Sequence, residues 1–249
     1  MDRAAQIETQ RAEYEKRGWT LARKAMPVEV ADATLYKIQQ ELGGDWESYQ
    51  GDYIKTFLTD QKAYECYSFD YSPMAMLQWG MTSYMSTVVG KDLLPSHAYF
   101  RVYRQGDVCH LHSDAKNCEH AMSLTLGYSN DLIWELNISD KYYDAKERRP
   151  ADVANEEGNI KLHGAPMGIG DAVIYNGINY LHGRVNPNPN RWSAHIFMHW
   201  VDRAGSYARY AFDEKWPDVV RQADFKFPDD DAPEKINPNR AEMVKERGR

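Results

Sequence analysis

The chain has 249 residues, of which 43% are hydrophobic and 12% are aromatic, and its formal net charge is −7. This composition is typical of a folded protein with a sizeable core, and the negative charge argues against nucleic-acid binding, which needs clustered Lys and Arg. Residues 1–18 carry charges along their length and no stretch approaches the ~18 apolar residues of a membrane span, so neither a signal peptide nor a membrane segment is predicted. The three cysteines have no framework spacing and indicate reduced thiols, which favours a cytoplasmic protein.

Residues 1–94 are expected to form a supporting region of helices and one strand. The polar residues 1–17 predict a surface helix, and residues 18–26 predict a short strand. A second helix is predicted over 27–44, because a proline suits its start and a pair of glycines suits its end. A third, amphipathic helix is predicted over 72–90, where a glycine again provides the stop.

From residue 95 the pattern changes to short runs rich in aromatic and branched residues, which Gly, Asn and Pro separate. Such runs predict the strands of a sandwich or barrel, so we expect a β core over 95–205 within one domain that spans 1–249. A polar insertion at 139–158 is a candidate for a mobile lid over a site. Residues 206–249 are charged and contain prolines, so they are expected to be a surface extension that is partly disordered.

The segment "CHLHSDAKNCEH", residues 109–120, concentrates side chains that bind metals. Residues i and i+2 of a strand lie on the same face, so His112 and Asp114 could hold one metal ion together. A zinc site built from Cys109 and Cys118 is disfavoured, because their spacing matches no zinc motif; these thiols are expected to be small buried hydrophobic residues.

A catalytic Fe(II) needs a third protein ligand and open coordination positions for its reactants, which two histidines and one carboxylate provide. His182, at the end of a predicted strand, is the candidate for the third ligand. Nine residues further on, Arg191 and Ser193 are expected to share a strand face, where a guanidinium and a hydroxyl can bind a carboxylate.

In this order and spacing, the residues resemble the signature of the Fe(II)/2-oxoglutarate-dependent dioxygenases, and in particular their prolyl 4-hydroxylase-like branch. Tyr103 and Gly106 before the metal histidine, and Tyr128 on the next strand, match that branch as well. The resemblance covers residues 95–202 well and residues 18–45 loosely. It implies a mainly β fold with flanking helices (α+β), in which helices pack on one face of a double-stranded β-helix of the jelly-roll type.

The resemblance also implies the roles of these residues. His112, Asp114 and His182 would bind Fe(II), with 2-oxoglutarate and O2 in the remaining positions. Arg191 would hold the far carboxylate of 2-oxoglutarate, and Ser193, Tyr128 and Tyr103 would add hydrogen bonds or line the pocket. These residues are expected to support hydroxylation of a C–H bond, coupled to decarboxylation of 2-oxoglutarate to succinate.

Four further residues are candidates for contact with the substrate: Arg101, His110, Trp134 and His195. An inward-pointing Arg101 would suit an anionic substrate group, and it would equally suit a structural ion pair. His110 shares the predicted face of His112, but Asp114 has the required spacing only from His112. His110 is therefore expected to be buried or to line the pocket, while Trp134 would line the mouth or pack.

The leading functional hypothesis is a hydroxylase of a small molecule, such as a free amino acid or a biosynthetic intermediate. A hydroxylase of peptidyl Pro, Lys or Asn is the alternative within the same chemistry, and desaturation or cyclisation would use the same residues. A β-barrel that binds a metal or ligand without oxygenase activity is the hypothesis from a different class. The Arg191–Ser193 pair argues against that barrel, because a plain metal site needs no carboxylate clamp.

Overall fold

The computed structural model describes residues 2–45, 47–144 and 160–214, together with Lys226, Pro233 and Lys235. Residues 1–217 form one compact unit and residues 218–249 form another, and every element below belongs to the first unit. Within the described residues, no helix is both long and apolar enough to cross a membrane.

Helices are concentrated in the first 90 residues, as the sequence predicted. The helix over 72–90 is in fact two helices, because α3 ends at Gly80 and α4 begins at Thr82. Glycine is a weak helix former, and this break lets each short helix follow the sheet beneath it. The α-helices are α1 (Arg3–Arg17), α2 (Val28–Leu42), α3 (Ser72–Gly80), α4 (Thr82–Val89) and the short α6 (Ala211–Glu214).

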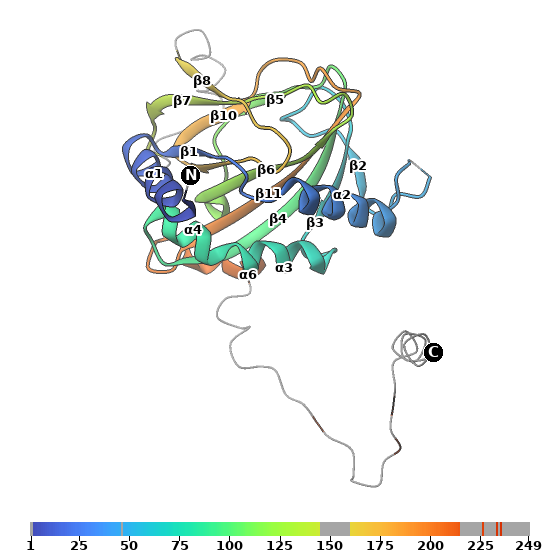
Figure 1. Ribbon diagram of the computed structural model, residues 1–249, viewed down its shortest axis with the longest axis horizontal. Helices are drawn as coiled ribbons and strands as arrows, with labels where there is room; N and C mark the ends of the chain where they lie inside the picture. The colour runs from blue at the N-terminus through green and yellow to red at the C-terminus, as the bar shows by residue number, and fades with distance from the viewer. Residues whose placement is uncertain are drawn as a thin grey trace. The chain divides into compact units, whose positions relative to one another are not determined.

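The strands form two antiparallel sheets (Figure 1). The larger sheet has the order β1-β9-β6-β11-β4-β3-β2, and the smaller sheet has the order β5-β10-β7-β8. The strands are β1 (Trp19–Ala22), β2 (Asp52–Ile54), β3 (Ala63–Tyr67), β4 (Leu93–Arg104), β5 (Cys109–His112), β6 (His120–Tyr128), β7 (Leu136–Tyr142), β8 (Leu162–Ala165), β9 (Ala172–Asn176), β10 (Tyr180–Arg184) and β11 (Trp192–Asp202).

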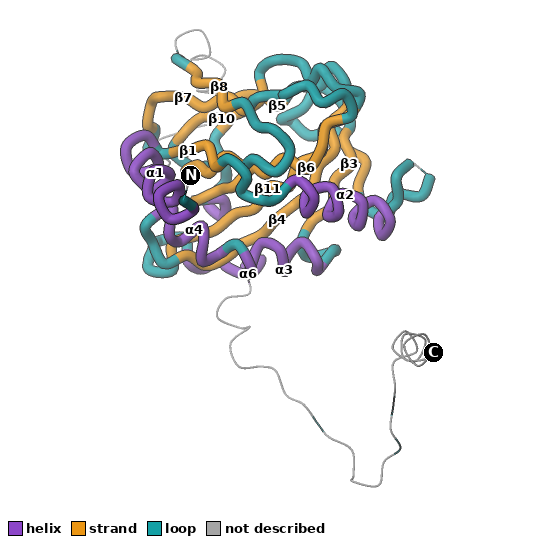
Figure 2. The backbone as a smooth tube through the Cα atoms, in the orientation of Figure 1, coloured by secondary structure: helices purple, strands orange, loops and turns teal. Residues whose placement is uncertain are grey.

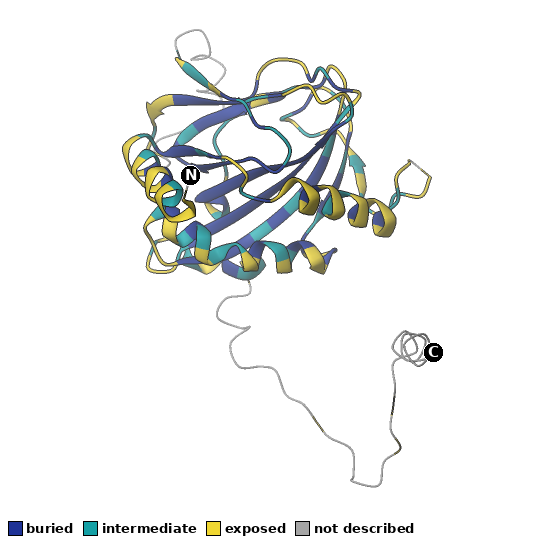
Figure 3. Cartoon of the chain, in the orientation of Figure 1, coloured by how far each residue is buried: buried dark blue, intermediate teal, exposed yellow. Residues whose placement is uncertain are grey.

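The first unit has three layers: the helices, the larger sheet and the smaller sheet (Figures 1 and 2). Buried side chains of α2, α3 and α4, among them Ile38, Met74 and Met85, form one core with the outward face of β4, β6 and β11. The helices therefore cover one face of the larger sheet, as predicted, and their opposite faces are exposed (Figure 3). The fold is mostly β with flanking helices.

The other face of the larger sheet points toward the smaller sheet, and it carries the polar and aromatic residues that build the site. Side chains alternate along a strand, so in β11 the residues Ala194, Ile196 and Met198 belong to the helix-facing core. Ser193 and His195 lie on the opposite face and are also fully buried. The space between the two sheets is therefore lined by groups that can bind a ligand.

Three expectations about chain organisation remain to be compared with the structure. Strands β2 and β3, which the sequence did not predict, extend the larger sheet within the supporting region. Of the proposed lid at 139–158, residues 139–142 are the end of strand β7, and residues 145–158 lie outside the described residues. Most of the predicted extension at 206–249 also lies outside them.

Candidate metal centre

Strands β5 and β10 of the smaller sheet bring the three predicted metal ligands together. His112, the last residue of β5, pairs in register with His182 of β10. Asp114 follows in the next turn, where its backbone N–H donates to the carbonyl of Gly177 at 2.9 Å. Two residues from one strand end and one from the neighbouring strand thus face a common point, as their spacing predicted.

The donor atoms of the three side chains converge. The Nε2 atoms of His112 and His182 lie 3.5 and 3.3 Å from Oδ1 of Asp114. Each histidine directs Nδ1 to a carbonyl of its own strand, to His110 at 2.7 Å and to Tyr180 at 3.0 Å. Because Nδ1–H is used in this way, the lone pair of each ring lies on Nε2, which is the usual arrangement of histidines that bind metals.

The electrostatic environment favours the protonation states that metal binding requires. Burial would raise the pKa of Asp114, but its electrostatic interactions with His182 and His112 outweigh burial and hold this pKa well below its usual value. Burial, followed by His182, lowers the pKa of His112. An ionised carboxylate beside a neutral imidazole is the ligand set of a divalent metal ion.

Two further observations support a metal at this point. Oδ2 of Asp114 is buried and has no hydrogen-bond partner among the described residues, so the carboxylate keeps a free acceptor. Gly177 packs against it so closely that a Cβ atom there would lie 2.2 Å from Oδ2. The donor set therefore fits Fe(II), and the backbone at Gly177 holds the carboxylate in place.

Arg184, which the sequence analysis missed, is a completely buried cation on the same strand as His182. Its Nη2 has neutral neighbours, Ser123 Oγ at 3.3 Å and His195 Nδ1 at 3.4 Å. Its Nε and Nη1 have no hydrogen-bond partner within the part of the chain that the structure describes. A buried charge without a counter-ion is costly, so an anion bound beside Arg184 would stabilise the folded protein.

His195 adds another unused donor beside Arg184. Burial, followed by the charge of Arg184, lowers its pKa well below the usual value, so the ring is neutral. Its Nδ1 faces both Thr125 Oγ1 and Arg184 Nη2, at 3.3 and 3.4 Å, and accepts from them. The proton then lies on Nε2, which is buried and has no acceptor among the described residues. Arg184 and His195 together offer three N–H groups to an anion.

The predicted carboxylate-binding pair is not brought into this group. Arg191 lies before the start of β11 and its side chain is exposed, so the expectation that it shares the interior face of Ser193 is wrong. Ser193 is buried, but its hydroxyl donates to Oδ1 of Asn188 at 2.7 Å. The loop that carries Asn188 closes this end of the sheet and leaves Arg191 outside.

The two predicted tyrosines lie near Arg184 and His195, with their rings centred 6.0 Å (Tyr103) and 5.8 Å (Tyr128) from the ring of His195. The hydroxyl of Tyr128 donates to the carbonyl of Met167 at 2.9 Å, and the hydroxyl of Tyr103 accepts from Arg101 at 3.1 Å. Both tyrosines therefore line the anion position.

The remaining candidates have different surroundings. Arg101 forms a buried ion pair with Glu65, with Nε 2.7 Å from Oε1, so its charge is already neutralised. His110 is exposed and lies 3.0 Å from Oδ1 of Asp60, which corrects the expectation that it is buried or lines the pocket. Trp134 is buried, and the guanidinium of Arg184 lies 5.2 Å from its ring centre. Trp134 therefore packs beside Arg184 in the interior.

No protein-family model matches the chain, and no curated protein matches it in sequence. Solved structures match it in fold. The epimerase SnoN from nogalamycin biosynthesis, in complex with Fe3+, alpha ketoglutarate and nogalamycin RO, has a TM-score of 0.63 at 12% identity, over 81% of this chain and 85% of that one.

Two further structures match at similar levels. AviO1 from Streptomyces viridochromogenes Tue57 has a TM-score of 0.55 at 18% identity, over 82% of this chain and 96% of that one. A Pseudomonas putida prolyl-4-hydroxylase has a TM-score of 0.52 at 13% identity, over 78% of this chain and 98% of that one. The chain therefore has the fold of the Fe(II)/2-oxoglutarate oxygenases, the family that its motifs resemble.

Proposed function

We propose that the chain is an Fe(II)- and 2-oxoglutarate-dependent dioxygenase that hydroxylates an unactivated C–H bond of a small molecule, with decarboxylation of 2-oxoglutarate to succinate. The observation that carries the proposal is the pairing of His112, Asp114 and His182 with a buried, uncompensated Arg184. A metal site alone would explain the first group, but only an anionic co-substrate explains both. We interpret the two sheets as a double-stranded β-helix that encloses them.

His112, Asp114 and His182 would hold Fe(II), which when bound supplies the oxidising chemistry with 2-oxoglutarate and O2. The protein's own residues bind and orient the reactants. Arg184 donates to the far carboxylate of 2-oxoglutarate, a role we assign to it instead of the exposed Arg191. His195 adds a neutral N–H donor to the same carboxylate, and this desolvated setting strengthens both interactions.

A small-molecule substrate is supported by the structural neighbours. SnoN is described in complex with nogalamycin RO, and EctD from S. alaskensis with 2-oxoglutarate and 5-hydroxyectoine. A protein hydroxylase is the second candidate, because a prolyl-4-hydroxylase is also among the neighbours. The cytoplasmic location and the division at residues 94 and 205 stay predictions.

The test mixes the apo-protein with Fe(II) and 2-oxoglutarate without oxygen and records the visible metal-to-ligand charge-transfer band. We expect the band in the parent protein and its loss in His112→Ala. Arg184→Met should need roughly 10- to 100-fold more 2-oxoglutarate for half the band, because a charged, buried hydrogen-bonded contact contributes about 1.5–3 kcal/mol. Arg191→Met is the matched control and should need the same concentration as the parent.

Two results would contradict the proposal in different ways. A parent protein that binds iron tightly but gives no band with 2-oxoglutarate is a metal-binding barrel without the proposed chemistry. A band that depends on Arg191 and not on Arg184 would keep the chemistry and reject the assignment of the clamp. Hydroxylated product, sought by mass spectrometry in small-molecule and in peptide libraries, then separates the two substrate classes.

A further inference from the structure

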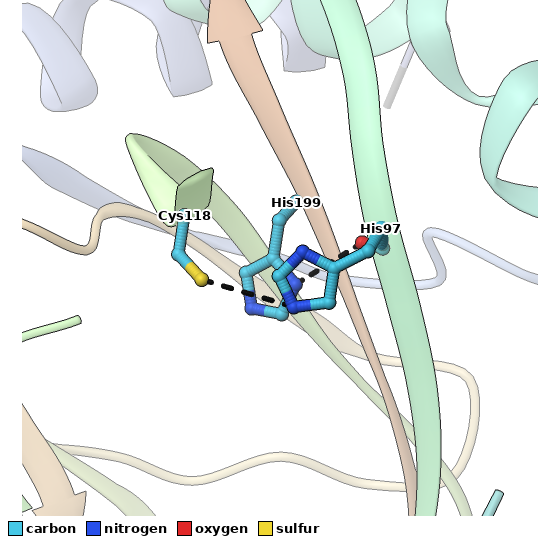
Figure 4. A group of neighbouring side chains, drawn as sticks. All are labelled: His97, Cys118 and His199. Atoms are coloured by element: carbon cyan, nitrogen blue, oxygen red, sulfur yellow. Dashed lines mark hydrogen bonds between the residues drawn. The ribbon is translucent and has the colours of Figure 1, made fainter. Parts of the chain in front are cut away.

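A second group of metal-binding side chains lies between the sheets, apart from the proposed iron ligands. It consists of His97 on β4, Cys118 at the end of the 3-10 turn η1 (Lys116–Cys118) and His199 on β11 (Figure 4). One donor atom from each residue lies within 4.8 Å of the other two. Cys118 and His199 are buried and His97 is partly buried, so the group is shielded from bulk water.

The fold builds this position with an irregularity in the larger sheet. The pairing of β11 with β4 shifts register between Met198 and Trp200, where the single residue His199 of β11 lies opposite Ser96 and His97 of β4, so the bulge is on β4. Gln78 of α3 donates from its side-chain amide to the carbonyl of His97 at 2.9 Å and also to the carbonyl of His199. The bulge is thus supported from behind, which is typical of bulges that aim side chains at a site.

The donor atoms point to the same side (Figure 4). Nδ1–H of His199 donates to the carbonyl of His97 at 3.2 Å, which leaves the lone pair on Nε2. Nε2 of His97 lies 3.9 Å from Sγ of Cys118. A tetrahedral zinc ion holds its nitrogen and sulfur ligands about 3.6 Å apart, so the observed separation needs a change of only a few tenths of an ångström.

We propose that His97, Cys118 and His199 bind a thiophilic divalent metal ion, of which Zn2+ is the example. Two imidazole nitrogens and one sulfur select zinc and similar ions over Mg2+ or Ca2+, which prefer oxygen. On binding, the Cys118 thiol releases its proton to solvent and coordinates as the thiolate, while both imidazoles stay neutral. The site does not depend on the proposed oxygenase activity.

The neighbouring groups are compatible with both the empty and the filled state. Without metal, Nδ2 of Asn117 lies 3.4 Å from Nδ1 of His97 and its Oδ1 lies 3.5 Å from Sγ of Cys118, so each donor has a partner. With metal, rotation of this amide presents its oxygen to Nδ1–H of His97. The ion would join η1 to the two central strands. It would thereby secure the turn between Asp114 and Cys118, both of which contact Gly177.

The experiment titrates the metal-free full-length protein with Co2+ in the absence of oxygen and follows the near-ultraviolet thiolate-to-cobalt charge-transfer band. The proposed iron ligands contain no sulfur, so this band reports only the second site. We expect two bound ions per chain and the charge-transfer band in the parent. Asp114→Ala should bind one ion and keep the band, whereas Cys118→Ser should bind one ion and lose it. Zn2+ should displace the cobalt and abolish the band.

Two further variants make the result specific. Cys66→Ser removes another buried thiol and should keep the full band, while His97→Gln should weaken Co2+ binding at least tenfold. Circular dichroism establishes that each variant is folded. The proposal is overturned if the folded parent shows no thiolate band at saturating Co2+, whatever the variants do. It is also overturned if the band persists in folded Cys118→Ser.

Discussion

Gly177 packs so closely against the side chain of Asp114 and the backbone of Cys118 that no side chain fits at this position. A Cβ atom at this position would lie 2.2 Å from Oδ2 of Asp114 and 2.6 Å from the backbone oxygen of Cys118. A movement of the Asp114 carboxylate, or of the backbone at Cys118, would change the arrangement of the three proposed metal ligands. The glycine is therefore required by the close approach of these groups, although it is not itself a ligand.

We predict that Gly177→Ala displaces Asp114 and weakens Fe(II) binding at least tenfold, because a shifted carboxylate no longer meets the two histidines. Overpacking of this kind also costs about 1–3 kcal/mol of unfolding free energy. Calorimetric titration with Fe(II) under anaerobic conditions measures the first effect, and urea denaturation measures the second. Gly80→Ala is the matched control, since a Cβ there meets no atom within 4 Å. Wild-type iron affinity in Gly177→Ala would show that the turn can adjust.

At this scale the sequence predicted the three side chains that the structure brings together, His112, Asp114 and His182, but not the buried Arg184. His112 and Asp114 are two residues apart, and strand alternation alone places them on one face. Arg184 follows the same rule relative to His182, so its position could have been found. The search instead favoured Arg191, because its spacing from His182 matched the family pattern. Only the structure shows that the chain turns outward before β11 begins.

At the scale of the elements, the bulge of β4 opposite His199 of β11, and its support by α3, connect the helical layer with the interior of the sheets. Gln78 is almost completely buried, and its amide reaches the carbonyls of two strands. Because a buried carbonyl that loses its partner costs about 1–3 kcal/mol, this single side chain stabilises the contact between helix and sheet. It also sets the relative position of His97 and His199.

We predict that Gln78→Leu lowers the unfolding free energy by about 1–3 kcal/mol, because the buried carbonyl of His199 loses the Gln78 donor, whereas the carbonyl of His97 keeps the Nδ1–H of His199. Urea denaturation gives the value. The exposed neighbour Trp79 provides the comparison, and Trp79→Gln should change stability by less than about 0.5 kcal/mol. If Gln78→Leu were as stable as the parent, water or a backbone shift would have to satisfy the carbonyl of His199.

Most elements were predictable, and the exceptions have physical reasons. Runs rich in aromatic and branched residues indicated the strands after residue 95, polar residues indicated α1, and a starting proline and ending glycines indicated α2. β2 has only three residues and lies at a sheet edge with little burial, so it carries almost no pattern. The division of the helix at 72–90 falls at Gly80, and a single glycine within a helical pattern does not by itself distinguish a break from a continuous helix.

At the scale of the whole molecule, the interior contains several histidines that are held neutral. Burial lowers the pKa of His120 to about 3, and burial followed by His199 does the same for His97. In the unfolded chain both rings would titrate near their ordinary pKa of about 6.5. Between about pH 3 and pH 6.5, the unfolded state therefore binds more protons than the folded state.

It follows that the contribution of each such histidine to the free energy of unfolding is fully present above about pH 6.5. This contribution falls as the pH decreases toward 3, by up to about 1.4 kcal/mol per pH unit for each histidine. We predict that His120→Gln reduces this slope, measured by urea denaturation between about pH 4 and 7.5. Leu132→Gln, which alters an exposed side chain that does not titrate, should leave the slope unchanged. Equal slopes in the parent and His120→Gln would mean that His120 remains unprotonated in the unfolded chain or accepts a proton in the fold.

His182 and Arg184 are separated by one glycine in a single strand. Two residues of extended chain span roughly 6.7 Å, and hydrogen bonds to β5 and β7 hold the strand on both sides. Under the proposed function, the strand thus fixes the backbone spacing between a metal ligand and the cation that binds the co-substrate. Loss or gain of one residue between them would turn one of the two side chains to the opposite face of the strand.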